Sequence, residues 1–191
     1  PSMQEVAALM AEPAPRVDYT QLWEQGLEDG TLDPVPDTLV RMGPESVTAL
    51  QQALGHEMPI VRWRAARALG LLGASAEPAV PTLMQAVTDE DVFVRKDAVR
   101  ALARIGPMGA PAALQALTGE DAFLHVDAVW GLGLVVNDID GALELLLQTL
   151  SGADLELRME AARALGNAGE AGVDPLLAAL DGAPPELRDI I

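Results

Sequence analysis

The residue types best suited to chemistry in this sequence are its two histidines and its many carboxylates. His56 and His125 lie far apart in the chain, and neither is followed by a second histidine at the spacing of a metal site. Cysteine is absent, which excludes disulfides, thiolate nucleophiles and cysteine-based metal centres. No Ser, His and Asp set indicates a nucleophile with its base. The sequence therefore favours a non-catalytic protein without a cofactor.

Basic residues instead recur at a regular interval, and we call their positions the anchors. The intervals are 33, 30, 33 and 30 residues, and alanine and leucine follow each of the first four anchors by three and seven residues. Self-similarity at such a period is typical of repeat architectures. The anchors are Arg62, Arg95, His125 and Arg158, with Arg188 as an incomplete fifth.

A second column of charge lies two residues after the anchors. It contains Arg64, Asp97, Asp127 and Glu160. Contact with the preceding anchor gives only favourable pairs, whereas contact with the following anchor would place Arg64 against Arg95. We therefore predict that these acids form a structural ladder between repeats. The predicted ladder residues are Arg62, Asp97, Arg95, Asp127, Glu160 and Arg158.

The third repeat departs from the pattern at two positions. His125 replaces the anchor arginine, and Trp130 replaces an arginine found five residues after the other anchors. The Trp130 position lies off the predicted core face, and tryptophan is frequent among residues that anchor interfaces. We therefore consider Trp130 a partner-binding residue; the alternative is that it packs beneath the following loop. A lone histidine is more often a hydrogen-bonded neutral side chain than a catalytic base.

Apolar side chains stand beside acidic residues near the start of each repeat. Ile60, Phe93 and Phe123 precede their anchors by two residues, next to acids at 89–91 and 120–121. The acids have a simpler explanation as helix caps, but an apolar ridge with an acidic rim also suits a basic amphipathic segment of another protein. The predicted partner-binding residues are Trp130, His125, Phe123, Phe93, Ile60 and Trp63, the last expected on the exposed side of its helix.

Two helices are predicted in each repeat. In the repeat after Asp91, apolar residues at helical spacing indicate a first helix that ends at Gly106, and Pro111 suits the start of a second helix. Neither helix can bury its apolar face alone, so the repeats must stack. We predict an all-α fold, an α-solenoid superhelix of about four to five stacked helix pairs, with the second helices lining the concave face.

The repeated segments resemble a known family. IVRWRAARALGLLG at 60–73 and FVRKDAVRALARIG at 93–106 are similar to the short HEAT-like repeats named from phycobilisome lyases, over roughly residues 57–191. The resemblance implies a protein-binding adaptor or scaffold. It also implies an alternative, a bilin lyase-like protein that handles a tetrapyrrole for phycobiliproteins. In that case Arg62, Arg95 and Arg158 would bind the propionates, provided that the ladder leaves them available.

The repeats also divide the chain into segments. The predicted segments are an N-terminal arm at 1–17, a cap with a degenerate repeat at 18–56, four repeats at 57–88, 89–118, 119–150 and 151–181, and an incomplete fifth at 182–191.

The charge of the chain limits its partners. Asp and Glu number 29 against 12 Lys and Arg, giving a formal net charge of -17. Such a chain repels phosphate backbones, so a nucleic-acid partner is not expected, and a basic or amphipathic protein is. A saline cytoplasm would explain the same composition without a functional meaning. No membrane span or secretory signal is recognisable, so we expect a soluble cytoplasmic protein; self-association through the ends of the array remains open.

Overall fold

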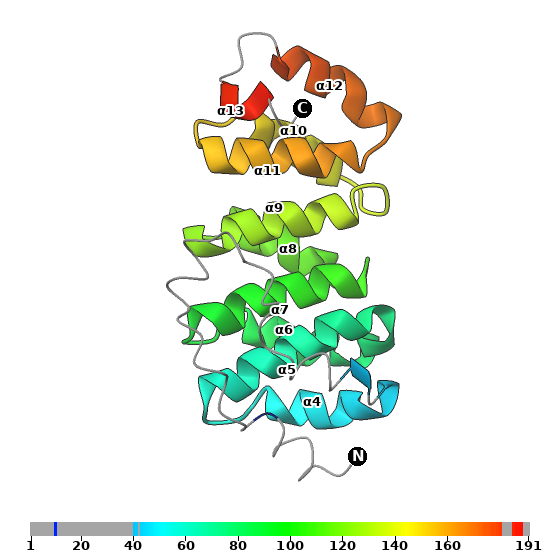
Figure 1. The fold of residues 1–191 in the computed structure, drawn as a ribbon, viewed down its shortest axis with the longest axis vertical. Coiled ribbons are helices and arrows are strands. Elements are labelled where there is room, and N and C mark those ends of the chain that lie inside the picture. Colours follow the sequence, from blue (N-terminus) through cyan, green and yellow to red (C-terminus); the bar gives the residue numbers. More distant parts are fainter. Residues whose placement is uncertain (1–9, 11–39, 42, 181–184, 189–191) are drawn as a thin grey trace.

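In the computed structural model, residues 10, 40–41, 43–180 and 185–188 are described. All regular structure in this part of the chain is helical, and the helices form two rows stacked in sequence order (Figure 1). The first helices are α5 (Pro59–Leu72), α7 (Val92–Ile105), α9 (His125–Leu134) and α11 (Leu155–Gly166). The second helices are α4 (Val47–Ala53), α6 (Val80–Ala86), α8 (Ala110–Thr118), α10 (Ala142–Leu150) and α12 (Glu170–Leu180).

Short elements complete the described chain. They are the 3-10 helices η1 (Pro44–Ser46), η2 (Gly73–Ala79) and η3 (Ala122–Leu124), and the last turn α13 (Pro185–Arg188). The fold is therefore an α-solenoid, as predicted. Apart from Met10, the predicted arm at 1–17 lies outside the described residues, as do residues 18–39 of the predicted cap and degenerate repeat.

Helix caps define where the first helices begin and end. Asp91 accepts hydrogen bonds from the amides of Phe93 and Val94, and the side chains of Asp121 and Asp154 cap η3 and α11 in the same way. The predicted caps Asp91 and Asp121 are confirmed, and Asp154 has the same role in the fourth repeat. At its other end α7 stops at Gly106, whose φ of 111° is a value that side chains disfavour.

The core lies between the two rows. The leucine seven residues after each anchor is fully buried, and leucines of the second helices face it. Burial of one such side chain contributes about 1.5–3 kcal/mol. These leucines are Leu69, Leu102, Leu132 and Leu165 from the first helices, with Leu83 and Leu146 from the second.

The N-terminal end of the core includes one residue from far earlier in the chain. Met10 is fully buried in the same cluster as Leu50 and Leu69. Its carbonyl oxygen accepts a 2.6 Å hydrogen bond from Nη1 of Arg64, which is itself completely buried. Arg64, the first residue of the second charged column, thus contacts a residue near the N-terminus of the chain.

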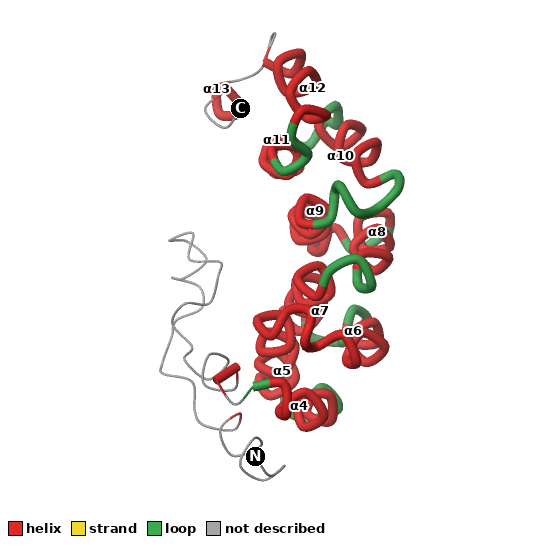
Figure 2. Tube along the Cα trace, turned by 90° about the vertical axis from the view of Figure 1, so that its right-hand side faces the viewer, coloured by secondary structure: helices red, strands yellow, loops and turns green. Residues whose placement is uncertain are grey.

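The stack curves with the first helices on its inner side (Figure 2). The prediction that the second helices line the concave face is therefore wrong. The reason lies in the small residues of the first helices, which allow close approach. A β-carbon at Gly70 would lie 2.8 Å from the Cα of Ala101, and one at Gly133 would lie 2.7 Å from the Cβ of Ala164. The more closely spaced row becomes the inner arc.

This close approach predicts the effect of a single methyl group. Gly133→Ala should lower the free energy of unfolding by about 1–2 kcal/mol, because overpacking costs about 1–3 kcal/mol and exceeds the gain in helix propensity. Gly166→Ala is the matched control, since a β-carbon there meets nothing within 4 Å. Urea denaturation of both variants tests this; equal stability of the two would contradict the packing explanation.

Candidate partner-binding edge

The anchors join consecutive repeats at one edge of the stack. We call the loops before the first helices the leading loops; they cover residues 54–58, 87–91, 119–121 and 151–154. Arg62 donates from Nε and Nη2 to the two carboxylate oxygens of Asp89 at 2.7 and 2.8 Å. Its Nη1 donates to the carbonyls of His56 and Glu57, both at 2.9 Å. One guanidinium thus connects its own leading loop to the next.

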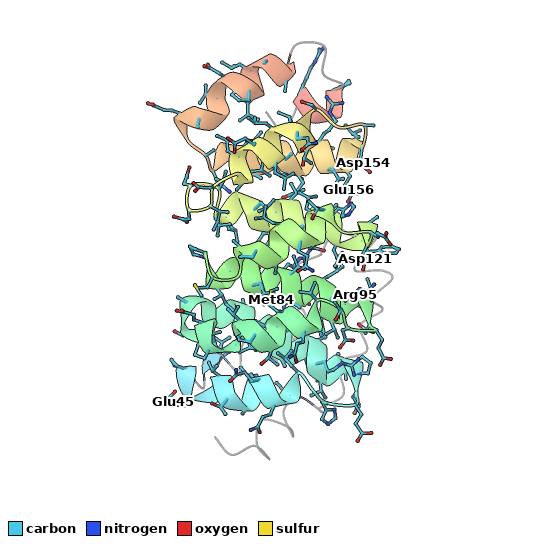
Figure 3. All side chains as sticks on the ribbon, turned by 180° about the vertical axis from the view of Figure 1, so that it is seen from behind. Glu45, Met84, Arg95, Asp121, Asp154 and Glu156 are labelled. Atoms are coloured by element: carbon cyan, nitrogen blue, oxygen red, sulfur yellow. The ribbon has the colours of Figure 1, made fainter. Side chains whose placement is uncertain are left out.

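Arg95 repeats the arrangement one unit later. Its Nε donates to Asp121 at 2.8 Å, and its Nη1 donates to the carbonyls of Asp89 and Glu90 at 2.9 and 3.1 Å. Figure 3 shows Arg95 and Asp121 on the same edge as Asp154 and Glu156 of α11 and its leading loop. The anchors therefore fasten the leading loops rather than the acids of the predicted ladder.

The Arg62 pair affects the ionisation of its acid. Partial burial raises the pKa of Asp89, but the hydrogen bonds from the Arg62 guanidinium and the Asp91 amide prevail, so the pKa lies below its ordinary value. The pair therefore stabilises the fold at neutral pH, and this contribution is lost as pH falls below the ordinary range of an aspartate.

The acids of the second column do contact the preceding repeat, but a different arginine. Asp97 lies 3.6 Å from Nη1 of Arg67, and Asp127 accepts a hydrogen bond from Nε of Arg100. These arginines stand five residues after the anchors. The predicted pairs of Arg62 with Asp97 and of Arg95 with Asp127 are therefore corrected, since both anchors already bind leading loops.

The fourth repeat shows the same correction. Glu160 accepts a 3.0 Å hydrogen bond from Arg163 of its own helix rather than from His125. Arg158 donates from Nε to the carbonyl of Leu150 at 3.1 Å. An acid of the second column thus pairs with an arginine of the preceding repeat at the first two repeat boundaries. At the third boundary, the acid pairs within its own helix instead.

Two carboxylates of this ladder are deeply buried. Burial raises the pKa of Asp97 and outweighs the nearby charges of Arg67 and Arg100. Burial likewise raises the pKa of Asp127 despite the ion pairs with Arg100 and Lys96, the latter at 3.5 Å. Desolvation costs of this kind are usual for buried ion pairs, so these contacts contribute less to stability than their geometry alone suggests.

An apolar hollow of about 190 Å³ lies where α5 and α7 begin. It is lined by Pro59, Ile60, Trp63, Asp91 and Phe93. Three predicted partner-binding residues thus lie together. Trp63 is half-buried rather than exposed, and its side chain forms a hydrogen bond with Asp97.

Exposed apolar side chains continue this edge along the stack. Phe93 is 47% and Phe123 72% exposed, and the nearby side chain of Glu90 is 82% exposed. Met58 and Leu155, which were not predicted as partner-binding residues, are also exposed at these ends of α5 and α11. The sequence feature that marks them is their position near an anchor: Met58 is four residues before Arg62, and Leu155 is three residues before Arg158.

Trp130 and His125 lie in two other hollows. Trp130 lines one of about 180 Å³ with Arg67, Arg100 and Arg104, and the Arg104 guanidinium carbon lies 5.1 Å from the centre of its ring. His125 lines one of about 340 Å³ between the third and fourth repeats. The six predicted residues therefore do not form one continuous site.

Two family models match the chain. The model for HEAT repeats matches residues 47–123, and the model for the PBS lyase HEAT-like repeat matches 157–182; together they cover more than half of the sequence. The chain belongs to the HEAT-repeat family. No curated protein matches it.

Solved structures with the same fold include natural and engineered proteins. The complex of CpcE and CpcF of phycocyanin lyase from Nostoc sp. PCC7120 is 24% identical, with 76% of this chain and 95% of that chain covered and a TM-score of 0.59. A designed armadillo repeat protein in complex with the peptide (KR)4 is 17% identical, with 99% and 96% covered and a TM-score of 0.59. An engineered protein of the Northeast Structural Genomics Consortium is 24% identical, with 98% and 84% covered and a TM-score of 0.56.

The described residues contain no group of three or more His, Asp and Glu that would hold a metal ion. Within the same residues, none of the helices has both the length and the apolar character needed to cross a membrane.

The raised pKa of Asp127 predicts the sign of a pH effect. A carboxyl whose pKa is higher in the folded state binds more protons there, so stability declines as pH rises through that pKa. Asn resembles the protonated form, and Asp127→Asn should therefore gain stability relative to the unsubstituted protein between pH 3 and 7. Urea denaturation across this range measures the difference. A relative loss on raising the pH would mean that the Arg100 and Lys96 pairs outweigh desolvation.

Proposed function

We propose that this HEAT-repeat protein is a non-catalytic adaptor or scaffold. Its partner is a protein segment that is both basic and amphipathic, and the docking surface is the edge formed by the N-terminal ends of the first helices. The observation that carries the proposal is the hollow at Ile60, Trp63 and Phe93, together with the exposed ring of Phe123 at the start of the next repeat.

Apolar contact supplies the affinity in this proposal. Complete burial of an exposed aromatic side chain contributes about 1.5–3 kcal/mol. Phe93 and Phe123 are 47% and 72% exposed, so each would gain a corresponding fraction of this when a partner covers it. Phe93 and Phe123 stand two residues before consecutive anchors. A segment that lies across both repeats would therefore cover both rings at once.

Charge selects the partner. The side chain of Glu90, next to Asp91 of the hollow, is 82% exposed and also pairs with Arg62 at 3.3 Å, and the chain as a whole has a net charge of -17. Opposite charges raise association rates and disfavour acidic competitors. A basic peptide, (KR)4, is also the ligand of the designed armadillo protein, whose likeness to this chain concerns the fold.

A labelled amphipathic peptide, with Leu or Phe alternating with Lys or Arg, tests the proposal by fluorescence anisotropy. The double variant Phe93→Ser, Phe123→Ser should weaken binding about tenfold or more, because about 1.4 kcal/mol corresponds to one power of ten in Kd. The melting temperature should change little, since both side chains are exposed in the free protein.

Two controls make this experiment decisive. Leu134→Ser removes an exposed apolar side chain at the opposite end of α9 and should leave Kd unchanged. A peptide with Glu in place of every basic residue should not bind. The proposal fails if the double variant binds as well as the unsubstituted protein, or if the acidic peptide binds equally.

A second candidate function is the handling of a bilin, as a bilin lyase-like protein acting on phycobiliproteins does. It is supported by the match to the PBS lyase HEAT-like repeat and by the hollow at Trp130. Arg62 and Arg95 are engaged with the leading loops, and Arg100 is paired with Asp127. In this candidate function a propionate group would contact Arg104, which lies against the ring of Trp130.

Visible absorbance distinguishes this candidate. Mixing with a bilin at micromolar protein should shift the absorbance band, and Trp130→Ala should abolish the shift by removing the ring that covers the pigment. The Phe93 and Phe123 substitutions should not alter it. An unchanged spectrum with the unsubstituted protein would count against bilin handling and would leave the adaptor proposal intact.

A further inference from the structure

At the first two repeat boundaries, the space between successive leading loops is filled by a guanidinium group. Arg62 fills it between its own loop and Asp89, and Arg95 fills it between its own loop and Asp121. Each arginine donates to the carbonyl six residues before it, that of His56 or of Asp89. An arginine site therefore occurs twice in this chain, with an internal occupant each time.

The third boundary has a carboxylate at the same place as the second boundary, but it lacks the arginine. His125 binds the carbonyl six residues before it, that of Gly119, at 2.9 Å from Nε2. The arginine side chains extend further, to the carboxylate of the next leading loop. The histidine side chain is too short to do so. Asp154 precedes the next anchor by four residues, as Asp121 does, and is therefore the counterpart of the carboxylate that binds Arg95.

Asp154 is equipped for the same double contact as Asp121. In Asp121, Oδ1 caps the Phe123 amide and Oδ2 accepts from Arg95. In Asp154, Oδ1 caps the Leu157 amide at 3.0 Å. Among the ion pairs of the described residues, none involves Asp154. Figure 3 shows Arg95, Asp121 and Asp154 along one edge of the stack.

A hollow lies where the guanidinium would be. Its volume is about 340 Å³, and its lining includes His125, Asp154, Gln148 and Thr149. At about 30 Å³ per water molecule in the liquid, this is room for on the order of ten waters, enough for an arginine side chain. The leucines at 117, 145 and 157 provide apolar walls for its methylene groups.

We propose that this hollow is a subsite for an arginine side chain supplied by the bound partner. The inference rests on the proposed function, because the arginine arrives on the basic segment that docks along the same edge. Arginine is favoured over lysine because its planar fork matches a carboxylate and leaves further donors for carbonyls. Arg62 and Arg95 make both kinds of contact within this chain.

The start of α11 does not oppose this ligand. The N-terminal end of a helix repels a cation, but the capping carboxylate of Asp154 stands between the helix and the hollow. Arg95 lies in the same relation to Asp121 at the start of η3. The chain therefore already holds a guanidinium in this environment.

The probe is Nα-acetyl-arginine amide, titrated into the protein while backbone amide NMR shifts of residues 119–125 and 151–157 are followed. Saturable shifts are expected at millimolar ligand. Nα-acetyl-citrulline amide has nearly the same shape without the charge, and it should bind at least tenfold more weakly. Equal affinity for the two ligands would overturn the proposal.

Two variants test the same site from opposite directions. Asp154→Asn keeps a good helix cap but removes the charge, and it should weaken arginine binding at least tenfold. His125→Arg restores the internal occupant. It should abolish binding and raise the melting temperature by about 2–4 °C, if the new contacts resemble those of Arg95. Circular dichroism checks that both variants are folded.

Asp138→Asn, the same change in an exposed loop, is the control and should have no effect. Unchanged arginine affinity in Asp154→Asn or in His125→Arg would refute the subsite. The outcome is separable from that of the proposed function. If the peptide binds through Phe93 and Phe123 but its affinity is the same in both variants, the docking edge is supported and the subsite is excluded. If arginine binds but the peptide does not, the subsite is supported and the docking edge is excluded.

Discussion

The close contact between consecutive first helices is the constraint on which the rest of the structure depends. Where Gly70 meets Ala101 and Gly133 meets Ala164, the two backbones approach to a distance that one added methyl group would prevent. This spacing makes the first helices the inner row of the curve. It also brings their N-terminal ends into line along one edge, where the leading loops, the anchors and the exposed aromatic rings all lie.

Many polar groups between the repeats bind one another or backbone carbonyls within the stack. Arg62 and Arg95 each satisfy loop carbonyls as well as a carboxylate. Asp97 and Asp127 are buried against arginines of the preceding repeat. Because these charges are engaged within the stack, the proposed recognition relies on the apolar rings at the edge and on the third boundary, where arginine is replaced.

The repeat period, the buried leucines and the aspartate caps were predictable, because each depends on spacing along a single helix. The partner of Arg62 was not. Asp97 and Asp89 are both acids of the next repeat, and only the position of the leading loop decides between them. The half-burial of Trp63 was also missed, because a helical wheel for α5 does not contain the neighbouring α7. The direction of curvature depends on the relative spacing of two rows and was predicted wrongly.

The anchors have a consequence for how such arrays diversify. Each arginine occupies a place formed by two repeats, so duplication of a unit also copies that place together with its occupant. Replacement of one arginine by a shorter side chain, as at His125, then leaves a hollow beside the next leading loop. In an array of this kind a new binding specificity can arise by the loss of a side chain. The repeat that departs from the common pattern then marks the position of the new site in the sequence.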